Sequence, residues 1–445
     1  MGDLLSIFDA AREAGEAVAL RIGGRSYTFA QLADLARARL VALERDAERT
    51  PYPLTGTNTL ETLVTLYALL ERGIAVLMLH PRLTAFERTV LLATAARLGP
   101  IAHDDAAVVM FTSGTTGEPR GAVLTRAALV ASAHASAANL GWRDDDCWLA
   151  CMTIAHVGGL SIVTRCLAAR RCIALAERFD GAQFPRWIAE NGVTLVSVVP
   201  TMLARVLDAH PNWKPPPHLR AVLVGGAAAS PRLLARAVER GVPVLATYGL
   251  TETCSQVTTI RYAARYSPAN IGAGEPLPGA QVRIVGGRIE VRGDMLMAGY
   301  WNEPPLAPGG WFDTGDLGEI DARGCLHVLA RHCDLIVTGG ESVYPAEVEQ
   351  VLEDIPGIAA AGVFGIPDEL WGAIVAAALV ADGAVPTEAV VLSHVESRLA
   401  PHKRPRHVCF VARLPQTPGG KLDRSALSAF ASAVRPLQSR RGARP

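Results

Sequence analysis

Short apolar runs that alternate with helical segments constrain the fold of this chain more than any other feature. Between about residues 60 and 330 the runs read AVLMLH, AAVVMFTS, VTLVSVVP, LRAVLVGG and VPVLATYG, each bounded by turn-forming residues. Segments with helical spacing of apolar residues, such as PRLLARAVERG, separate these runs. Continuous apolar runs are typical of strands buried in a parallel sheet, with helices as the crossovers. The pattern predicts an α/β fold of layered, mostly parallel sheets.

The pattern changes near residue 280, where short alternating strands with glycine turns begin, as in AQVRIVGGRIEVRGDMLMAGYW. This change indicates a small β-rich section at the end of a large domain. Beyond Arg331, helical segments such as PAEVEQVLEDI alternate with apolar strands such as AIVAAALV, which predicts a small α+β domain. We therefore expect an N-terminal domain over 1–331, a hinge at 332–333, a mobile C-terminal domain over 334–432 and a basic, frayed tail over 433–445.

Size and charge limit the class of protein. A chain of 445 residues exceeds what one hydrophobic core usually organises, and its 50% hydrophobic content can fill sizeable cores. Lysine plus arginine equals aspartate plus glutamate at 43 each, so no net field attracts nucleic acid or an anionic membrane. We expect neither nucleic acid nor a membrane as a partner.

The N-terminus and the cysteines indicate the compartment. The first residues, MGDLLSIFDAAREAGEAVAL, lack the basic start and the unbroken apolar run of a signal peptide. Eight cysteines are scattered without a CxxC pair or zinc-like spacing, and Cys147 and Cys151 are expected to be buried thiols. These features predict a reduced, cytoplasmic protein.

The strongest local signal is FTSGTTGEPRGAVLT, which covers residues 111–125. Its glycines allow tight turns that bring backbone N–H groups to an anion, while hydroxyls and one guanidinium add donors. No GK[ST] sequence closes the loop, so it is not a Walker loop. We expect a phosphate-binding loop for a nucleotide that contains Thr112, Ser113, Gly114, Thr115, Thr116, Gly117, Arg120 and Gly121.

This loop resembles the phosphate-loop signature of the acyl- and aryl-CoA synthetase superfamily of adenylate-forming enzymes. Four further segments are similar to the superfamily's motifs and occur in the same order: YGLTET (248–253), FDTGDL (312–317), ARHCDLIVTGGESVYPAEVE (330–349) and TPGGKLDR (417–424). The resemblance covers nearly the whole chain. It implies an acid–thiol ligase that uses ATP, Mg²⁺ and coenzyme A. The sequence leaves open whether the chain forms a homo-oligomer.

The resemblance implies a role for each matching residue. Tyr248 would stack on adenine, Thr251 would donate to the α-phosphate, and Glu252 would hold the magnesium ion. Gly225 and Gly226 would form a wall of the adenine pocket; an ordinary strand-to-helix turn is the alternative interpretation.

Three charged residues complete the implied machinery. Asp316 would accept hydrogen bonds from the two ribose hydroxyls, and Arg331 would reach the same sugar. Lys421 would enter from the small domain and stabilise the charge that develops on the α-phosphorus. Surface ion pairs for the first two residues and an exposed loop lysine for the third are the alternatives.

The resemblance also implies that two reaction steps, adenylation of the acid and transfer of the acyl group to CoA, occur at one active site. Rotation of the small domain would bring in Lys421 for adenylation and then Gly339 and Gly340 for attack by the thiol of CoA. The chain departs from the usual pattern at Arg120, where lysine is usual, at Ala330, where glycine is usual, and at Cys333, where aspartate is frequent. We expect catalysis to tolerate the Arg120 change.

The pocket for the acid is expected between residues 152–160, 196–203, 225–226 and the segment after Glu252. His156, Ser255 and Gln256 are the candidate substrate-binding residues, with a structural histidine as the alternative for His156. Within the superfamily the chain most resembles the o-succinylbenzoate–CoA ligases of menaquinone biosynthesis. Another aryl or medium-chain acid, or a carrier-protein thiol in place of CoA, is the alternative.

Two other classes of protein fit the sequence less well. A serine hydrolase or acyltransferase would need a GxSxG segment, which this chain lacks. A non-catalytic nucleotide-binding or scaffold protein would be expected to have lost Lys421, Glu252 or Asp316, and all three are present.

Overall fold

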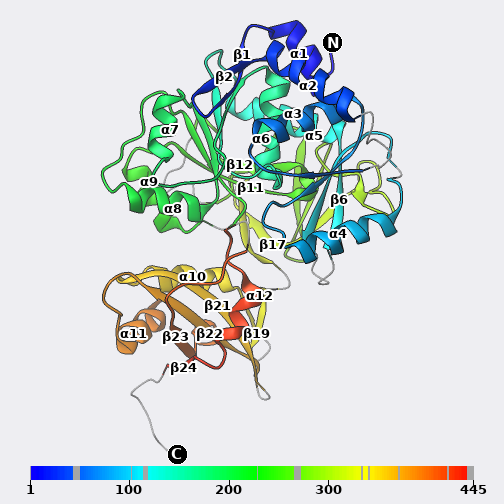
Figure 1. Ribbon diagram of the computed structural model, residues 1–445. Helices are drawn as coiled ribbons and strands as arrows, with labels where there is room; N and C mark the ends of the chain where they lie inside the picture. The colour runs from blue at the N-terminus through cyan, green and yellow to red at the C-terminus, as the bar shows by residue number, and fades with distance from the viewer. Residues whose placement is uncertain are drawn as a thin grey trace, which may run out of the picture.

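The computed structural model describes residues 2–43, 51–101, 103–113, 119–227, 229–264, 272–331, 334–338, 341–368, 371–417 and 420–437. Figure 1 shows a large N-terminal body above a small C-terminal body, with the chain passing between them near residue 330. The α/β class predicted from the sequence is confirmed. Within the described residues, no helix is both long enough and apolar enough to cross a membrane.

A nine-stranded sheet forms the centre of the large domain. In spatial order its strands are β13 (Glu275–Pro276), β12 (Ser255–Thr259), β11 (Val244–Leu250), β10 (Ala221–Val224), β9 (Leu195–Val198), β7 (Cys147–Ala150), β8 (Cys172–Leu175), β1 (Val18–Ile22) and β2 (Arg25–Thr28). The neighbours from β11 to β1 pair in parallel, and the outer pairs are antiparallel. Strands β7 to β10 are buried at every residue, as their continuous apolar sequences predict.

A five-stranded sheet packs beside the first. Its strands in spatial order are β16 (Gly299–Tyr300), β6 (Pro119–Thr125), β5 (Ala106–Ser113), β4 (Val76–Leu79) and β3 (Tyr52–Thr55). The first three strands along the chain pair in parallel, whereas β5, β6 and β16 pair antiparallel. The glycine-rich loop therefore joins two antiparallel strands, and β6 lies between that loop and the next helix.

Helices cover the faces of both sheets (Figure 1). They are α1 (Ile7–Ala14), α2 (Phe29–Leu43), α3 (Leu60–Glu71), α4 (Ala85–Leu98), α5 (Arg126–Leu140), α6 (Val157–Ala169), α7 (Phe184–Glu190), α8 (Pro200–Ala209) and α9 (Pro231–Glu239), with a 3₁₀ turn η1 (Thr251–Thr253). Side chains at the first turn fix several helix starts: Thr125 accepts the amide of Ala128 in α5, and Ser230 accepts the amide of Leu233 in α9. One hydrophobic core runs through both sheets and the helices other than α4, and α4 packs against a second core on the five-stranded sheet.

The β-rich section predicted after residue 280 is an antiparallel four-stranded sheet. Its order is β14 (Ala280–Val285), β15 (Arg288–Gly293), β17 (Phe312–Ile320) and β18 (Leu326–Arg331). A small core that includes Tyr248 of β11 joins it to the large sheet. The section therefore belongs to the large domain.

The small domain has its own core, formed by residues between Ile336 and Leu437. Its elements are β19 (Ile336–Thr338), β20 (Glu341–Val343), α10 (Pro345–Glu353), β21 (Ile358–Asp368), β22 (Gly372–Ala381), α11 (Glu388–Arg398), η3 (Pro401–Lys403), β23 (His407–Phe410), α12 (Arg424–Leu427), η4 (Ser428–Phe430) and β24 (Arg435–Pro436). Strands β21 to β24 form one sheet in sequence order.

The start of the tail differs from the sequence-based expectation. We expected a frayed segment from residue 433, but Arg435–Pro436 pairs with β23, and the amide of Leu437 donates to the carbonyl of Arg406 at 2.7 Å. The side chain of Leu437 is 8% exposed within the core of the small domain. Burial of this one apolar side chain outweighs the basic, proline-containing character of the segment.

The cysteines behave as expected. The seven cysteines in the described part of the chain are free and buried, and they include Cys147 and Cys151. Burial raises the pKa of the Cys151 thiol to about 12, so this thiol is not reactive at neutral pH.

We propose that the two cores are separate domains joined at His332 and Cys333, which lie outside the described residues. Limited proteolysis should then yield one fragment that ends near Arg331 and one that begins near Asp334, because each fragment keeps its own core. Mass spectrometry of the products checks this. Loss of the C-terminal fragment without a stable N-terminal fragment would contradict two independent cores.

Candidate active site

A continuous cleft of about 3870 Å³ lies between the two domains. Its walls include the segments after the carboxyl ends of β9, β10 and β11, the turn η1, strand β17, and the small-domain loop that leads to Lys421. A typical ligand pocket measures about 300–1,000 Å³. The cleft is therefore large enough for several substrates at once.

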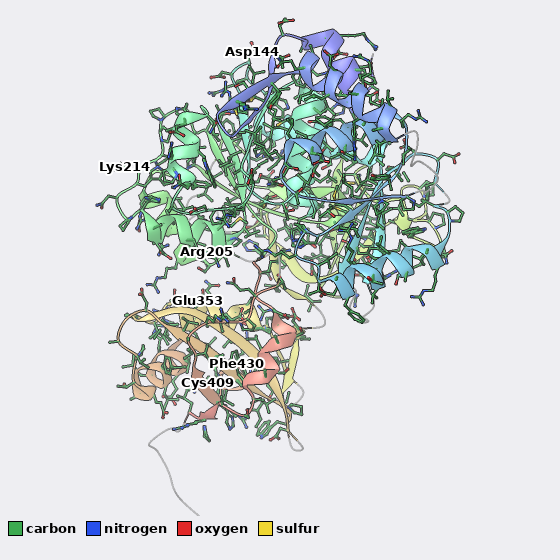
Figure 2. The ribbon with its side chains drawn as sticks, viewed as in Figure 1. Asp144, Arg205, Lys214, Glu353, Cys409 and Phe430 are labelled. Carbon is green, nitrogen blue, oxygen red and sulfur yellow. The ribbon has the colours of Figure 1, made fainter. Side chains whose placement is uncertain are left out.

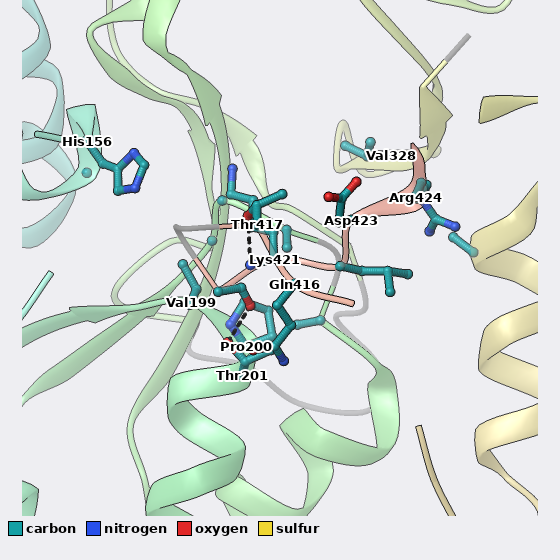
Figure 3. A pocket seen from close by; sticks show the side chains of 18 of the residues that line it. His156, Val199, Pro200, Thr201, Val328, Gln416, Thr417, Lys421, Asp423 and Arg424 are labelled. Carbon is teal, nitrogen blue, oxygen red and sulfur yellow. Dashed lines mark hydrogen bonds between the residues drawn. The ribbon is translucent and has the colours of Figure 1, made fainter. Parts of the chain in front are cut away.

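Lys421 projects from the small domain into this cleft (Figure 3). A tight turn holds it, because the amide of Thr417 donates to the carbonyl of Lys421 at 2.8 Å and Gly420 adopts φ +80°. Thr201 of α8 donates its hydroxyl to the carbonyl of Gly420 at 3.0 Å. A β-carbon placed on Gly226 would lie 3.8 Å from the Lys421 Nζ atom. Two segments that are far apart in the sequence thus meet at one point.

Tyr248 and Asp316 form a buried pair. The Tyr248 hydroxyl donates to Asp316 Oδ2 at 2.7 Å, with the two residues 9% and 4% exposed. Arg331 lies opposite Asp316 across strands β17 and β18. Sequence reasoning placed all three residues in the nucleotide site but missed the hydrogen bond, which fixes the orientation of both the ring and the carboxylate.

Gly225 and Gly226 follow β10, and each has a structural reason to be glycine. A β-carbon on Gly225 would lie 2.6 Å from Thr247 Cγ2, and Gly226 adopts φ +78°. Both residues line the cleft. Gly225 and Gly226 therefore form a strand-to-helix turn and also line the cleft, so the two interpretations of these glycines are compatible.

Thr251 and Glu252 lie in η1, at the end of β11, and both line the cleft. The hydroxyl of Tyr300 donates to Glu252 Oε1 at 2.8 Å. Burial raises the pKa of the Tyr300 phenol, and the Glu252 charge adds to the shift, so the phenol remains a donor. A half-buried carboxylate whose orientation is fixed by one donor fits the oxygen ligand that magnesium prefers.

Arg120 is engaged differently from what we expected. Its Nε donates to Glu303 Oε1 at 2.8 Å, and the guanidinium lies 3.5 Å from the centroid of the Tyr300 ring. The ion pair with Glu303 raises the pKa of Arg120. Arg120 therefore supports Tyr300 and, through it, Glu252. The planar guanidinium makes this stacking favourable, as the ammonium of a lysine would not.

Part of the predicted phosphate loop lies outside the described residues. Thr112 lines the cleft and donates to the carbonyl of Arg120 at 3.4 Å, and Ser113 pairs with Pro119 in the β5–β6 ladder. Gly121 also belongs to this hairpin. Gly114, Thr115, Thr116 and Gly117 fall outside the description, as do Gly339 and Gly340.

His156 is the N-cap residue before helix α6 and lines the cleft, where its ring centroid lies 4.9 Å from that of His80. Enclosure by the cleft walls, together with His80, Lys421 and Arg82, lowers the pKa of His156 to about 4. The ring is therefore neutral at pH 7 and can both donate and accept a hydrogen bond. His80 and Arg82 were not singled out in the sequence, because no motif contains them.

Gln256 lines the cleft, but Ser255 is absent from the described residues that do so. The Gln256 amide nitrogen donates to Thr247 Oγ1 at 3.0 Å and to Thr259 Oγ1 at 2.9 Å. Ser255 adopts φ +109° at the start of β12, where it pairs with Leu250 of β11. The described cleft lining gives no support to the prediction that its side chain contacts the acid.

Arg165 is a site residue that sequence reasoning missed. Its side chain lines the cleft although the residue is only 2% exposed, and its Nε and Nη2 atoms have no hydrogen-bond partner in the described structure. Burial lowers its pKa to about 10, so it remains a cation at pH 7. The guanidinium lies 5.5 Å from the centroid of the Trp148 ring, and this contact offsets only part of the cost of burying a cation. An arginine within the apolar stretch GGLSIVTRCLAA was the available signal.

The fold and the cleft define an adenylate-forming class of protein, and comparison with known families agrees. The sequence matches the AMP-binding enzyme family over residues 93–301 and the C-terminal domain of the same enzymes over residues 347–421. The chain belongs to the AMP-binding enzyme family.

Individual members of the family that resemble this chain are CoA ligases for one acid. A 2-succinylbenzoate–CoA ligase of Bacillus cereus is 42% identical over 339 residues, which are 73% of this chain and 70% of the relative. The o-succinylbenzoate CoA synthetase of Bacillus subtilis in complex with its acyl-adenylate intermediate is 30% identical, with a TM-score of 0.87 over 99% of both chains. The same enzyme with ATP and magnesium ion superposes with a TM-score of 0.87 at 30% identity, over 96% of this chain and 99% of that one.

The position of Lys421 predicts a selective effect of its removal. Lys421→Ala should lower adenylate formation about 10² to 10³-fold, because one donor to a developing charge is lost. Thioester formation from pre-formed acyl-adenylate should stay near the wild-type rate. Lys214→Ala, which removes an exposed lysine far from the cleft, is the matched control (Figure 2). Equal losses in both half-reactions would contradict a role limited to the first step.

The position of Lys421 near His156 also predicts a change in the pKa of His156 when the lysine is removed. Because a nearby ammonium opposes protonation of His156, Lys421→Ala should raise the pKa of His156 from about 4 toward the ordinary value of 6.5. NMR titration of labelled histidines measures this change, with Lys214→Ala as the control. Because burial is the largest cause of the lowered pKa, the rise should be partial, and an unchanged His156 pKa in Lys421→Ala would contradict a contribution from the Lys421 ammonium.

Proposed function

We propose that this protein is an ATP-dependent o-succinylbenzoate–CoA ligase that acts through an acyl-adenylate, as in menaquinone biosynthesis. The observation that carries the proposal is the entry of Lys421 from the small domain into the large domain's cleft, beside Gly226. The Lys421 ammonium lies in the same cleft as Gly226 and the Thr251 hydroxyl. A cation at this position suits a reaction in which negative charge develops on phosphorus.

The proposed reaction has two steps. In the first, an oxygen of the acid's carboxylate attacks the α-phosphorus of ATP, and the bond to pyrophosphate breaks. In the second, the CoA sulfur attacks the acyl carbonyl carbon, the bond to AMP breaks, and the thiol proton leaves. Thr251 and Lys421 would donate to the α-phosphate in the first step.

The remaining residues would hold the nucleotide. Tyr248 offers its ring to adenine, while the carboxylate that it orients, Asp316, would accept from the ribose. Glu252 would hold magnesium, which neutralises phosphate charge when it is bound. Tyr300 keeps the Glu252 carboxylate in place.

Arg165 supports an acid with a second carboxylate. It lies on helix α6, whose N-cap is His156, and both residues line the same cleft. The ring carboxylate of o-succinylbenzoate would supply the anion that this buried cation otherwise lacks.

A panel of acids tests the function. Pyrophosphate release with ATP and Mg²⁺ should be fastest, in kcat/KM, for o-succinylbenzoate, and CoA should be the acceptor that yields a thioester. A much higher kcat/KM for benzoate or a fatty acid would refute this substrate. Transfer to a carrier-protein thiol and not to CoA would refute the acceptor.

The buried arginine gives a sharper test of the acid. Arg165→Met should lower kcat/KM for o-succinylbenzoate by about 10 to 100-fold, because a charge-assisted hydrogen bond is lost. The effect should be much smaller for 3-benzoylpropionate, which lacks the ring carboxylate. Arg165→Lys, which keeps the charge, should fall between Arg165→Met and the wild type. Equal losses for both acids would show that Arg165 acts only in packing.

A further inference from the structure

Hydrogen bonds between the two domains are of two kinds. Thr201 and Arg205, both on α8, donate to Gly420 and Gln416 at 3.0 and 3.3 Å, and these acceptors lie on the loop that carries Lys421. Arg232 on α9 makes the second kind. Its Nη1 donates to the carbonyl of Glu353 at 2.6 Å and lies 3.4 Å from the carbonyl of Ile358. This contact reaches the body of the small domain rather than the Lys421 loop.

The Arg232 guanidinium donates to the carboxyl end of helix α10, which makes the contact favourable. Glu353 is the last residue of α10, and the final carbonyls of a helix have no partner within the helix and carry a partial negative charge. A guanidinium is a suitable cap for such an end. Figure 2 labels Glu353 on the surface of the small domain that faces Arg205 of the large domain. Because donor and acceptors belong to different domains, this cap depends on their relative orientation.

The sequence around Arg232 directs it toward the small domain. Ser230 caps α9 and Pro231 occupies its first turn, so the helix starts at a defined residue. Arg232 is the next residue, and helical side chains lean toward the N-terminus, which lets its guanidinium extend past the start of the helix. Arg236, one turn further, instead donates to Asp208 at 2.7 Å within the large domain.

We propose that Arg232 is a positioning residue that selectively stabilises the orientation in which Lys421 occupies the cleft. A contact present in one orientation and absent in another shifts the population toward the first. Arg232 therefore favours the adenylation step and opposes rotation toward the thioester step. This inference rests on the proposed two-step function, because it assigns Arg232 to one of the two orientations.

The two half-reactions, measured separately, test this role. Arg232→Ala should slow single-turnover acyl-adenylate formation about threefold to tenfold, as expected for a partly exposed hydrogen bond to a charged donor. Thioester formation from pre-formed acyl-adenylate should be unchanged or faster. Arg232→Lys should recover part of the first step, since an ammonium can still donate to one carbonyl. The control Arg236→Ala should leave both steps at wild-type rates.

A distance measurement makes the inference independent of catalysis. Spin labels introduced at the exposed positions Lys214→Cys and Val385→Cys, in a Cys333→Ser background, report the separation of the domains. Arg232→Ala should shift or broaden the distance distribution of the protein without substrates, and Arg236→Ala should not.

The outcomes separate the two proposals. Equal losses of Arg232→Ala in both half-reactions, or a distance distribution identical to that of the wild type, would overturn the positioning role. A wild-type protein that forms no acyl-adenylate from any acid would refute the proposed function, while the distance measurement would still decide whether Arg232 sets the orientation.

Discussion

The parallel alignment of β7, β9, β10 and β11 is the constraint on which the site depends. Parallel strands end at the same edge of a sheet, so the segments that follow them meet there whatever their separation in the chain. The segments that begin at Val199, Gly225 and Thr251 are brought together in this way, and His156 arrives from the loop after β7. Because the strands are buried on both faces, this edge is where polar groups can face a ligand.

The charged side chains of the cleft favour an anionic acid and a nucleotide with its metal ion as ligands. Arg165 and Lys421 both contribute cations to the cleft, the first from helix α6 of the large domain and the second from the small domain. Glu252 and Asp316 are carboxylates held by the hydroxyls of Tyr300 and Tyr248. A cleft with fixed cations and oriented carboxylates suits an anionic acid beside a nucleotide and its metal ion. The phenolic donors matter because they orient the carboxylates without neutralising them.

Polar contacts join the two domains, and among the described residues no hydrophobic core spans both of them. Thr201, Arg205 and Arg232 each donate to backbone or amide oxygens of the small domain, and the two domains keep separate hydrophobic cores. Each contact contributes on the order of 1 kcal/mol. Such an interface can stabilise one orientation of the domains and can also break without unfolding either domain. An enzyme whose domains reorient between two steps at one site needs both properties.

Local pattern determined much of this protein. The buried strands, the small domain and the motif residues Glu252, Asp316 and Lys421 were all evident from periodicity, turn residues and resemblance. Only the tertiary structure decided that Arg120 binds Glu303, that Arg165 is buried with its Nε and Nη2 lacking a hydrogen-bond partner among the described residues, and that Leu437 completes a core. The physical reason is that periodicity reports which face of an element is apolar, whereas the partner of a polar side chain depends on which elements pack together. Arg120 and Glu303 are 183 residues apart, and no local signal connects them.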